Sequence, residues 1–216
     1  MRKNGFTLLE VLITISIVGI IAALSMSALV KNTNKAHIGP SLAKFVSSFE
    51  NAAGQLIQEE RIDKLSDLGN FTNNVMPKLE EHLIVTPLGG NSSNYSYKSP
   101  DGSNPTAFNN AFQTNDGSIF DVSDTIPTPS TGAGGSYLGA QGVIILDING
   151  AKGTGKAGTE TFMFIVDDSG KLIPWGSKTH RRLSDGEITA CSLTSSNAMA
   201  GFACTGRIAD NGWRVE

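Results

Sequence analysis

The sequence predicts an α+β protein in which a long N-terminal helix is followed by a C-terminal antiparallel β-sheet. Residues 6–30 form an apolar run, and apolar side chains then recur every three or four residues from 42 to 57, which is typical of an amphipathic helix. From residue 118 onward, short segments rich in Val, Ile and Phe alternate with Gly- and Asn-rich turns, as in antiparallel sheets. A chain of 216 residues accommodates one such helix and one domain.

The apolar run at residues 6–30 has the length of a transmembrane helix. As a helix it is roughly 37 Å long, more than the ~30 Å of bilayer hydrocarbon. Arg2 and Lys3 precede it, and a short basic N-terminus stays in the cytoplasm, so we expect the chain after Val30 to lie outside. The sequence therefore predicts a single-pass membrane anchor in front of an external domain.

Glu10 is the only charged residue in this run. A carboxylate in a membrane-spanning helix costs roughly 2.5–3.5 kcal/mol on insertion scales, so it needs a partner or a proton. An ordinary secretory signal peptide is one alternative, but its apolar core of roughly 7–15 residues is shorter than this run. A plain anchor is another, and it explains neither Glu10 nor the Gly5–Phe6 pair before it.

Residues 3–10, KNGFTLLE, resemble the leader and cleavage motif of type IV prepilins and the related pseudopilins. The resemblance implies that a prepilin peptidase cuts after Gly5, that the new amino terminus at Phe6 is methylated, and that Glu10 pairs with that amine, usually on a neighbouring subunit. An ammonium group at Phe6 is a suitable counter-ion, because an unpaired charge is strongly penalised in low-dielectric surroundings. The resemblance also implies the pilin fold, in which the long helix packs on the sheet.

The predicted organisation has four segments. They are the leader peptide at 1–5, the transmembrane and filament-core helix at 6–30, the amphipathic second half of the long helix at 31–63, and the globular head with its sheet and a disulfide-closed C-terminal region at 64–216. Pro40 either begins a second helix or kinks a continuous one, because proline lacks an N–H and clashes with the preceding turn.

Within the head, the sequence predicts one short helix and several strands. The helix is expected at 74–83 with Pro77 in its first turn, and the strands at 118–122, 142–147, 161–166 and 171–175. Consecutive turn signals predict irregular chain at 87–118 and 125–135. The tail from Gly176 is expected to be loop-like and to end in a hairpin whose turn contains Asn211–Gly212.

Cys191 and Cys204 are the only cysteines of the chain. An even pair in an oxidising compartment favours a disulfide over a metal site or a nucleophile. His37, His82 and His180 are scattered, and neither C-x-x-C nor H-E-x-x-H occurs. We therefore predict a Cys191–Cys204 disulfide that contributes roughly 3 kcal/mol to stability.

Residues 147–150, Asp-Ile-Asn-Gly, have two interpretations. The first is a turn that leaves a strand. The second is a Ca²⁺ site formed by Asp147 and Asn149 with Glu160 or Asp167 nearby, and the resemblance implies that some pseudopilins hold such an ion. The further acidic ligands and the closing Glu of an EF-hand loop are missing. We expect no cofactor, with Ca²⁺ at Asp147, Asn149 and Glu160 as the alternative.

Two further motifs invite functional interpretations. Residues 150–157 nearly match a phosphate-binding loop, but Ala157 replaces the required Ser or Thr and a strand is expected to follow instead of a helix. The basic cluster of Lys178, His180, Arg181 and Arg182 is either a solvated loop or a contact with acids on the next subunit, namely Glu59, Glu60 or Asp63.

Together these features predict a structural protein and no enzyme, since no nucleophile–base arrangement is recognisable. The net charge of −3 argues against nucleic-acid binding. We expect a pilin that forms a homopolymeric type IV pilus for adhesion, motility or surface interaction. A pseudopilin of type II secretion and a non-polymerising anchored binding module are the alternatives. The resemblance implies as partners the prepilin peptidase and methyltransferase and an assembly platform of a pilus or secretion system. It also implies that the precursor lies in the bacterial inner membrane and is later part of an extracellular filament or a periplasmic pseudopilus.

Overall fold

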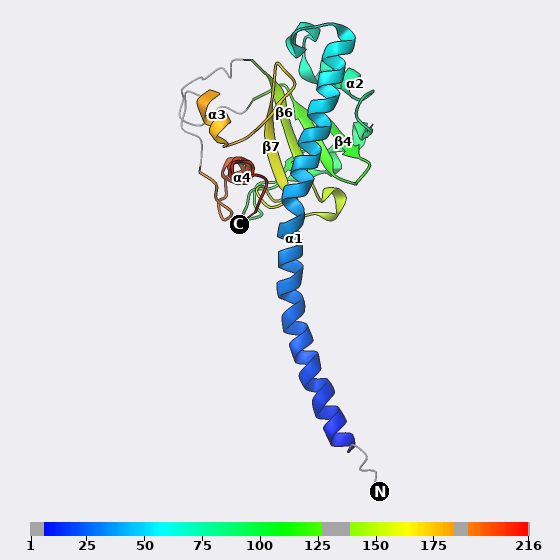
Figure 1. Cartoon of the computed structure of the whole chain (residues 1–216), viewed down its shortest axis with the longest axis vertical. Coiled ribbons are helices and arrows are strands. Elements are labelled where there is room, and N and C mark those ends of the chain that lie inside the picture. The colour runs from blue at the N-terminus through cyan, green and yellow to red at the C-terminus, as the bar shows by residue number, and fades with distance from the viewer. Residues whose placement is uncertain (1–6, 127–138, 184–189, 216) are drawn as a thin grey trace. The chain divides into compact units, whose positions relative to one another are not determined.

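The computed structural model describes residues 7–126, 139–183 and 190–215 of the chain (Figure 1). The chain divides into two compact units, Met1–His37 and Ile38–Glu216, which are described separately. The helical elements are α1 (Leu8–Glu60), η1 (Leu65–Leu68), η2 (Phe71–Val75), α2 (Met76–Leu79), η3 (Gly89–Asn94), η4 (Gly150–Lys152), α3 (Lys178–Leu183) and α4 (Ala198–Asp210). The strands are β1 (Val85–Pro87), β2 (Ser96–Tyr97), β3 (Thr106–Ala107), β4 (Ala111–Thr114), β5 (Ile119–Ser123), β6 (Ala140–Asp147), β7 (Thr161–Asp167) and β8 (Leu172–Pro174).

Helix α1 is continuous from Leu8 to Glu60 and contains Pro40. The helix is therefore continuous through Pro40, and Pro40 does not begin a second helix. In the second unit, the predicted apolar stripe of α1 is buried, with Leu42, Phe49, Ala53 and Leu56 among its core residues. Within the described ranges, none of the helices is both long and apolar enough to cross a membrane, so the predicted span at 6–30 is unconfirmed.

A six-stranded antiparallel sheet forms the centre of the second unit, in the order β1-β4-β5-β6-β7-β8. The four predicted strands are confirmed as β5, β6, β7 and β8. The longest pairing joins β6 to β7 and runs from Ala140 opposite Asp167 to Asp147 opposite Thr161. Pro174 is the last residue of the edge strand β8, a position where its missing N–H removes no central hydrogen bond.

Successive residues of β6 belong to two different hydrophobic cores. Ile144 and Leu146 join the core that contains α1, η2 and α2, whereas Val143 and Ile145 join the core that contains Phe202 of α4. Because side chains alternate between the faces of a strand, these two cores lie on opposite faces of the sheet. The expected coverage of the sheet by the long helix is found on one face, and α4 covers the other.

Helix α4 replaces the hairpin that the sequence predicted at the C-terminus. Asn197 caps its start, with the side chain accepting a hydrogen bond from Met199 N, and Asn211 follows its last residue. Gly212 has φ +66°, so the Asn211–Gly212 pair ends a helix here and does not join two strands. The prediction of a loop-like tail from Gly176 is also wrong, because α3 and α4 both lie there.

Residues 87–118 are more ordered than predicted. They contain β4, which lies inside the main sheet between β1 and β5, and the small separate sheet of β2 and β3. The carboxylate of Asp121 accepts hydrogen bonds from the backbone N–H groups of Asn109 and Asn110, at 2.9 and 2.6 Å, which fixes the turn before β4. Turn signals on both sides of so short a strand concealed it in the sequence.

Two other local predictions have different outcomes. The helix predicted at 74–83 is shorter, since η2 leads into α2 and the α-helical turn ends at Leu79. Pro77 lies in the first turn of α2, as expected from its missing N–H. Most of the loop predicted at 125–135 lies outside the described residues.

Candidate functional site

The start of α1 is organised by Thr7 and Glu10. The Glu10 carboxylate oxygen Oε2 accepts hydrogen bonds from Thr7 N at 2.9 Å and from Thr7 Oγ1 at 3.0 Å. In return, Glu10 N donates to Thr7 Oγ1 at 3.3 Å. This reciprocal pattern is a capping box, which satisfies backbone donors that have no partner inside the helix. Glu10 therefore has a local partner within its own chain.

The apolar residues on both sides of Glu10 are exposed around the helix. Leu8 is 82% and Leu9 66% exposed, and the same holds for Val11, Leu12, Ile13, Ile15, Ile17, Val18, Ile20 and Ile21. The hydroxyls of Thr14 and Ser16 donate to the carbonyls of Val11 and Leu12, so these polar groups are satisfied inside the helix. A helix that is apolar on all sides is stable only when lipid or protein surrounds it. This part of α1 is thus suited to packing against other helices or lipid.

Residues 1–26 match the family model of the prokaryotic N-terminal methylation motif. This motif is the class III leader of type IV pilins and pseudopilins. No curated protein and no solved structure matches the chain. The chain thus carries a pilin-type leader on an α+β fold that is consistent with the pilin fold.

Two of the predicted leader residues lie outside the described part of the chain. Gly5 and Phe6 precede Thr7, which is the first residue that the structure describes. Cleavage between them, methylation of Phe6 and pairing of its amine with Glu10 of another subunit therefore stay predictions. The capping box was not predicted, although Thr7 and Glu10 have the spacing that is its sequence signature.

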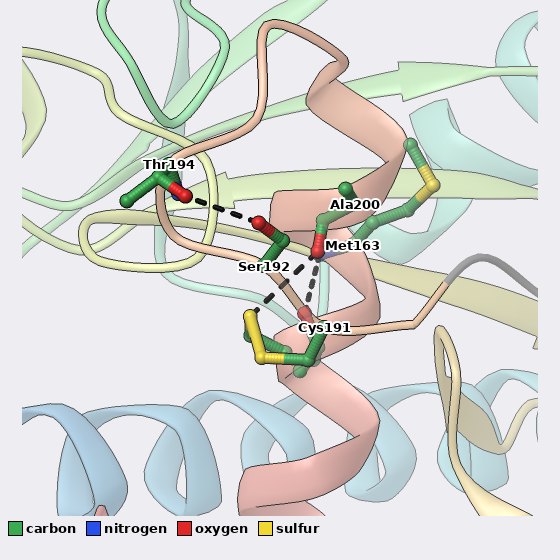
Figure 2. The surroundings of a disulfide bond; sticks show 7 residues. Met163, Cys191, Ser192, Thr194 and Ala200 are labelled. Atoms are coloured by element: carbon green, nitrogen blue, oxygen red, sulfur yellow. Dashed lines mark hydrogen bonds between the residues drawn. A yellow bond between two sulfur atoms is a disulfide. The ribbon is translucent and has the colours of Figure 1, made fainter.

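The predicted disulfide joins Cys191 to Cys204, with a Cα–Cα distance of 4.6 Å. Cys204 lies in α4. Figure 2 shows Cys191 in the segment that leads to this helix. Ser192 N donates to the carbonyl of Ala200 at 3.0 Å, and Thr194 N donates to Ser192 Oγ at 3.4 Å. The bond and these contacts hold the segment at 191–194 against the first turns of α4.

The structure places the carboxylates of Asp147 and Glu160 near each other, beside Gly153. A Cβ atom added to Gly153 would lie 3.5 Å from Asp147 Oδ1 and 3.1 Å from Glu160 Oε2. Asp147 Oδ1 accepts hydrogen bonds from the N–H groups of Asn149 and Gly150, both at 3.0 Å. Burial raises the pKa of Asp147 to about 6, and the nearby charge of Glu160 acts in the same direction, while the two backbone hydrogen bonds oppose the shift.

Glu160 closes the other side of the same loop. Its Oε2 atom accepts hydrogen bonds from Thr154 Oγ1 at 2.8 Å and from Gly155 N at 2.7 Å. The described residues contain no group of three or more His, Cys, Asp or Glu side chains that could hold a metal ion. Asp147 and Glu160 would thus be two carboxylate ligands of a Ca²⁺ ion, and the rest would have to be backbone or Asn149 oxygens. From η4 the loop continues into β7, so a strand follows this glycine-rich segment, as predicted.

The predicted basic cluster does not form one exposed surface. His180 is completely buried, its Nδ1 atom accepts a hydrogen bond from Gly176 N at 2.9 Å, and its ring packs on Trp175. His180 is thus part of the protein interior, and including it in an exposed cluster was wrong. Lys178 is exposed, while the side chains of Arg181 and Arg182 lie outside the described part of the chain.

Two of the three acids suggested as partners of that cluster, Glu59 and Glu60, already have contacts inside the chain. Glu59 lies 3.2 Å from His82 Nε2, and Glu60 forms an ion pair with Lys78. A contact between copies through Glu59 or Glu60 would have to compete with these pairs. Its contribution is therefore expected to be small, as for most exposed ion pairs.

Proposed function

We propose that this chain is a structural subunit that polymerises into an extracellular type IV pilus-like filament for adhesion, motility or surface interaction. The observation that carries the proposal is a methylation leader followed by a helix whose apolar residues are exposed on all sides. Inside a filament, the apolar helices of neighbouring copies would bury these residues against one another. The head, residues 38–216, has its own hydrophobic cores on the two faces of its sheet.

The driving force is the transfer of α1 from lipid surroundings to protein surroundings. Helix association in an apolar medium depends on close packing and on polar contacts between helices. The amine of a cleaved Phe6 would supply such a contact to Glu10 of the next copy, replacing the hydrogen bonds from Thr7. A contact that repeats head to tail without closing a ring produces an open helical polymer.

The precursor is proposed to sit in the bacterial inner membrane with its N-terminus in the cytoplasm. A prepilin peptidase and methyltransferase would process it, and an assembly platform of a pilus or secretion system would extract it. The basic residues Arg2 and Lys3 before the apolar run support this orientation.

The test is the substitution Glu10→Ala. We expect leader removal to continue, because cleavage acts before Phe6, while sheared filaments are lost. Mass spectrometry of the N-terminus and electron microscopy measure the two effects. Ser16→Ala is the matched control on the same helix, since the Ser16 hydroxyl donates to Leu12 O of its own helix, and it should leave filaments intact. Normal filaments from Glu10→Ala would refute the proposal.

A pseudopilin of type II secretion is the second candidate, because the same leader occurs in both groups. Sheared surface material from wild-type cells separates the two. Filaments made mainly of this chain indicate a pilus, whereas their absence favours a periplasmic pseudopilus or a lone anchored binding module.

Ca²⁺ at Asp147, Asn149 and Glu160 remains an alternative to a cofactor-free subunit. The closeness of the two carboxylates to Gly153 supports it. Both carboxylates already accept hydrogen bonds from backbone N–H groups of the loop, which indicates that the loop is held in place without an ion. A melting temperature that rises with Ca²⁺ relative to EDTA would favour the ion, and equal values would remove it.

A further inference from the structure

A polar pocket of about 330 Å³ lies on the head where the chain around β2, the end of β6 and the loop at 150–155 meet. Its lining includes Asn94, Ser96 and Thr154, which carry amide and hydroxyl groups, and the aromatic residue Tyr95. A cavity of ~150 Å³ holds a benzene molecule, so this pocket has room for a six-membered ring with substituents. Its size and its mixture of aromatic and polar groups are typical of small-molecule sites.

Asp147 brings a buried acceptor into this pocket. The residue is 5% exposed, and its Oδ1 atom accepts the two hydrogen bonds from Asn149 N and Gly150 N. Its Oδ2 atom accepts no hydrogen bond from the described residues, and it is not one of the unpartnered side-chain atoms that are sealed from solvent. Because Asp147 lines the pocket, we infer that Oδ2 is open to it. A mostly buried carboxylate oxygen lowers stability unless it accepts a hydrogen bond, so a donor placed in the pocket would complete the site.

The charged residues that line the pocket have opposite signs. They are Asp147 and Lys98, whereas the nearby Glu160 does not line it. Opposite charges largely cancel in the field of the whole pocket, so it has little attraction for a free anion or cation. The pocket nevertheless contains strong acceptors and donors side by side. A neutral ligand with several hydroxyl groups suits this arrangement, because each hydroxyl both donates and accepts.

We propose that the pocket binds one ring of a neutral sugar, with a sugar hydroxyl donating to Asp147 Oδ2. Lys98 and Asn94 can donate to other sugar oxygens, and the ring of Tyr95 offers apolar surface to the C–H groups of the sugar. The site gives the adhesion named in the proposed function a ligand class, and it rests on that function for its role at the cell surface. The binding itself needs only the head and is measurable on the unpolymerised chain.

The first test follows the backbone amide signals of the ¹⁵N-labelled full chain by NMR, in EDTA and in a detergent without a sugar headgroup. Glucose, galactose, mannose and N-acetylglucosamine are added one at a time. We expect at least one of them to shift the amides of Gly153 and Gly155, with a dissociation constant of roughly a millimolar, as for other ligands of about a dozen non-hydrogen atoms. Cyclohexanol, a similar ring with a single hydroxyl, should bind much more weakly.

Three outcomes of this experiment overturn the proposal. In the first, none of the four sugars shifts these amides. In the second, glycine shifts them and the sugars do not, which would assign a zwitterion to Asp147 and Lys98. In the third, the sugars act only when Ca²⁺ replaces EDTA, which would assign the contact to the ion. Each outcome leaves filament formation to be decided separately by electron microscopy.

The second test is Asp147→Asn. The amide oxygen can still accept from Asn149 N and Gly150 N, so we expect the head to fold, as its melting temperature would show. The amide NH₂ then replaces the free acceptor, and binding of the sugar should weaken about tenfold or more.

Asp121→Asn is the matched control. Asp121 is similarly buried, at 7% exposed, and its Oδ1 atom also accepts two backbone N–H bonds, but it does not line the pocket. The control should bind the sugar like the wild type. Unchanged binding in Asp147→Asn, or an equal loss in both variants, would contradict the contact with Asp147.

Discussion

At the scale of single residues, two carboxylates illustrate how local geometry determines the state of a charged group. The charge of Glu10 would be unfavourable in an apolar helix without a partner. Three hydrogen bonds join Glu10 to Thr7 at the start of the helix. Asp147 is only 5% exposed and lies near Glu160. The first carboxylate is satisfied by the helix terminus, whereas the second stays difficult to ionise because burial disfavours its charge.

Asp147→Asn should change how the stability of the head depends on pH. The pKa of Asp147 rises from 3.8 to about 6 on folding, so its stabilising contribution is complete below pH 4 and is lost as the pH rises through 6. The amide of the variant cannot ionise, and its oxygen can accept the same two hydrogen bonds. We expect the variant to be more stable at pH 7.5, by about 3 kcal/mol at most, and nearly unchanged in relative stability at pH 4.

Urea unfolding of the detergent-solubilised chain at both pH values measures this effect. Glu81→Gln, which removes an exposed carboxylate from the same head, is the control. Equal gains at pH 4 and pH 7.5 would show that ionisation of Asp147 is not the cause.

At the scale of elements, α4 depends on glycines at which the helix closely approaches the loops beside the sheet. A Cβ atom on Gly206 would lie 2.0 Å from Ser177 N, and one on Gly201 would lie 2.6 Å from the Cβ of Ala157. Glycine lowers helix propensity by about 1 kcal/mol relative to alanine. The packing of α4 against the loops beside the sheet therefore stabilises a helix that its own sequence disfavours.

Gly206→Ala should destabilise the head, although alanine is the better helix former. The added methyl group has no room against Ser177, and overpacking of this kind costs about 1–3 kcal/mol. Gly54→Ala in α1 is the matched control, because nothing lies within 4 Å of the added Cβ. The control should be neutral or more stable by up to ~1 kcal/mol. Thermal unfolding compares the two, and equal stability changes would contradict the packing argument.

At the scale of the whole molecule, the sheet of the second unit has a core on each face. The core with α1 contains large aromatic and aliphatic side chains, and the core with α4 is tied to the preceding segment by the disulfide. Loss of the disulfide should therefore loosen the second core before the first.

The double variant Cys191→Ser with Cys204→Ser tests this division. The cysteines are 13 residues apart, and closing a loop of about this length stabilises a protein by roughly 3 kcal/mol. We expect a lower melting temperature and faster hydrogen exchange in α4, with less change in the strands that face α1. Uniformly faster exchange across both cores would show that they unfold as one unit.

The sequence by itself determined the elements whose signals are local and strong. The apolar run after the leader, the buried stripe from Leu42 to Leu56, and the strands β5 to β8 each follow from periodicity or β-branched composition. The leader motif was recognisable because Gly5, Phe6 and Glu10 lie at fixed spacing. The cysteine pair was predictable because the chain contains only two.

Tertiary structure alone decided the features that depend on partners distant in the sequence. Helix α4 forms because Gly201 and Gly206 allow its backbone to reach residues 157 and 177, and no local pattern shows this. His180 is buried because the ring of Trp175 packs against it, although its basic neighbours suggested a surface position. Local propensity amounts to a fraction of a kcal/mol per residue, whereas burial and close packing contribute several, so packing prevails where the two disagree.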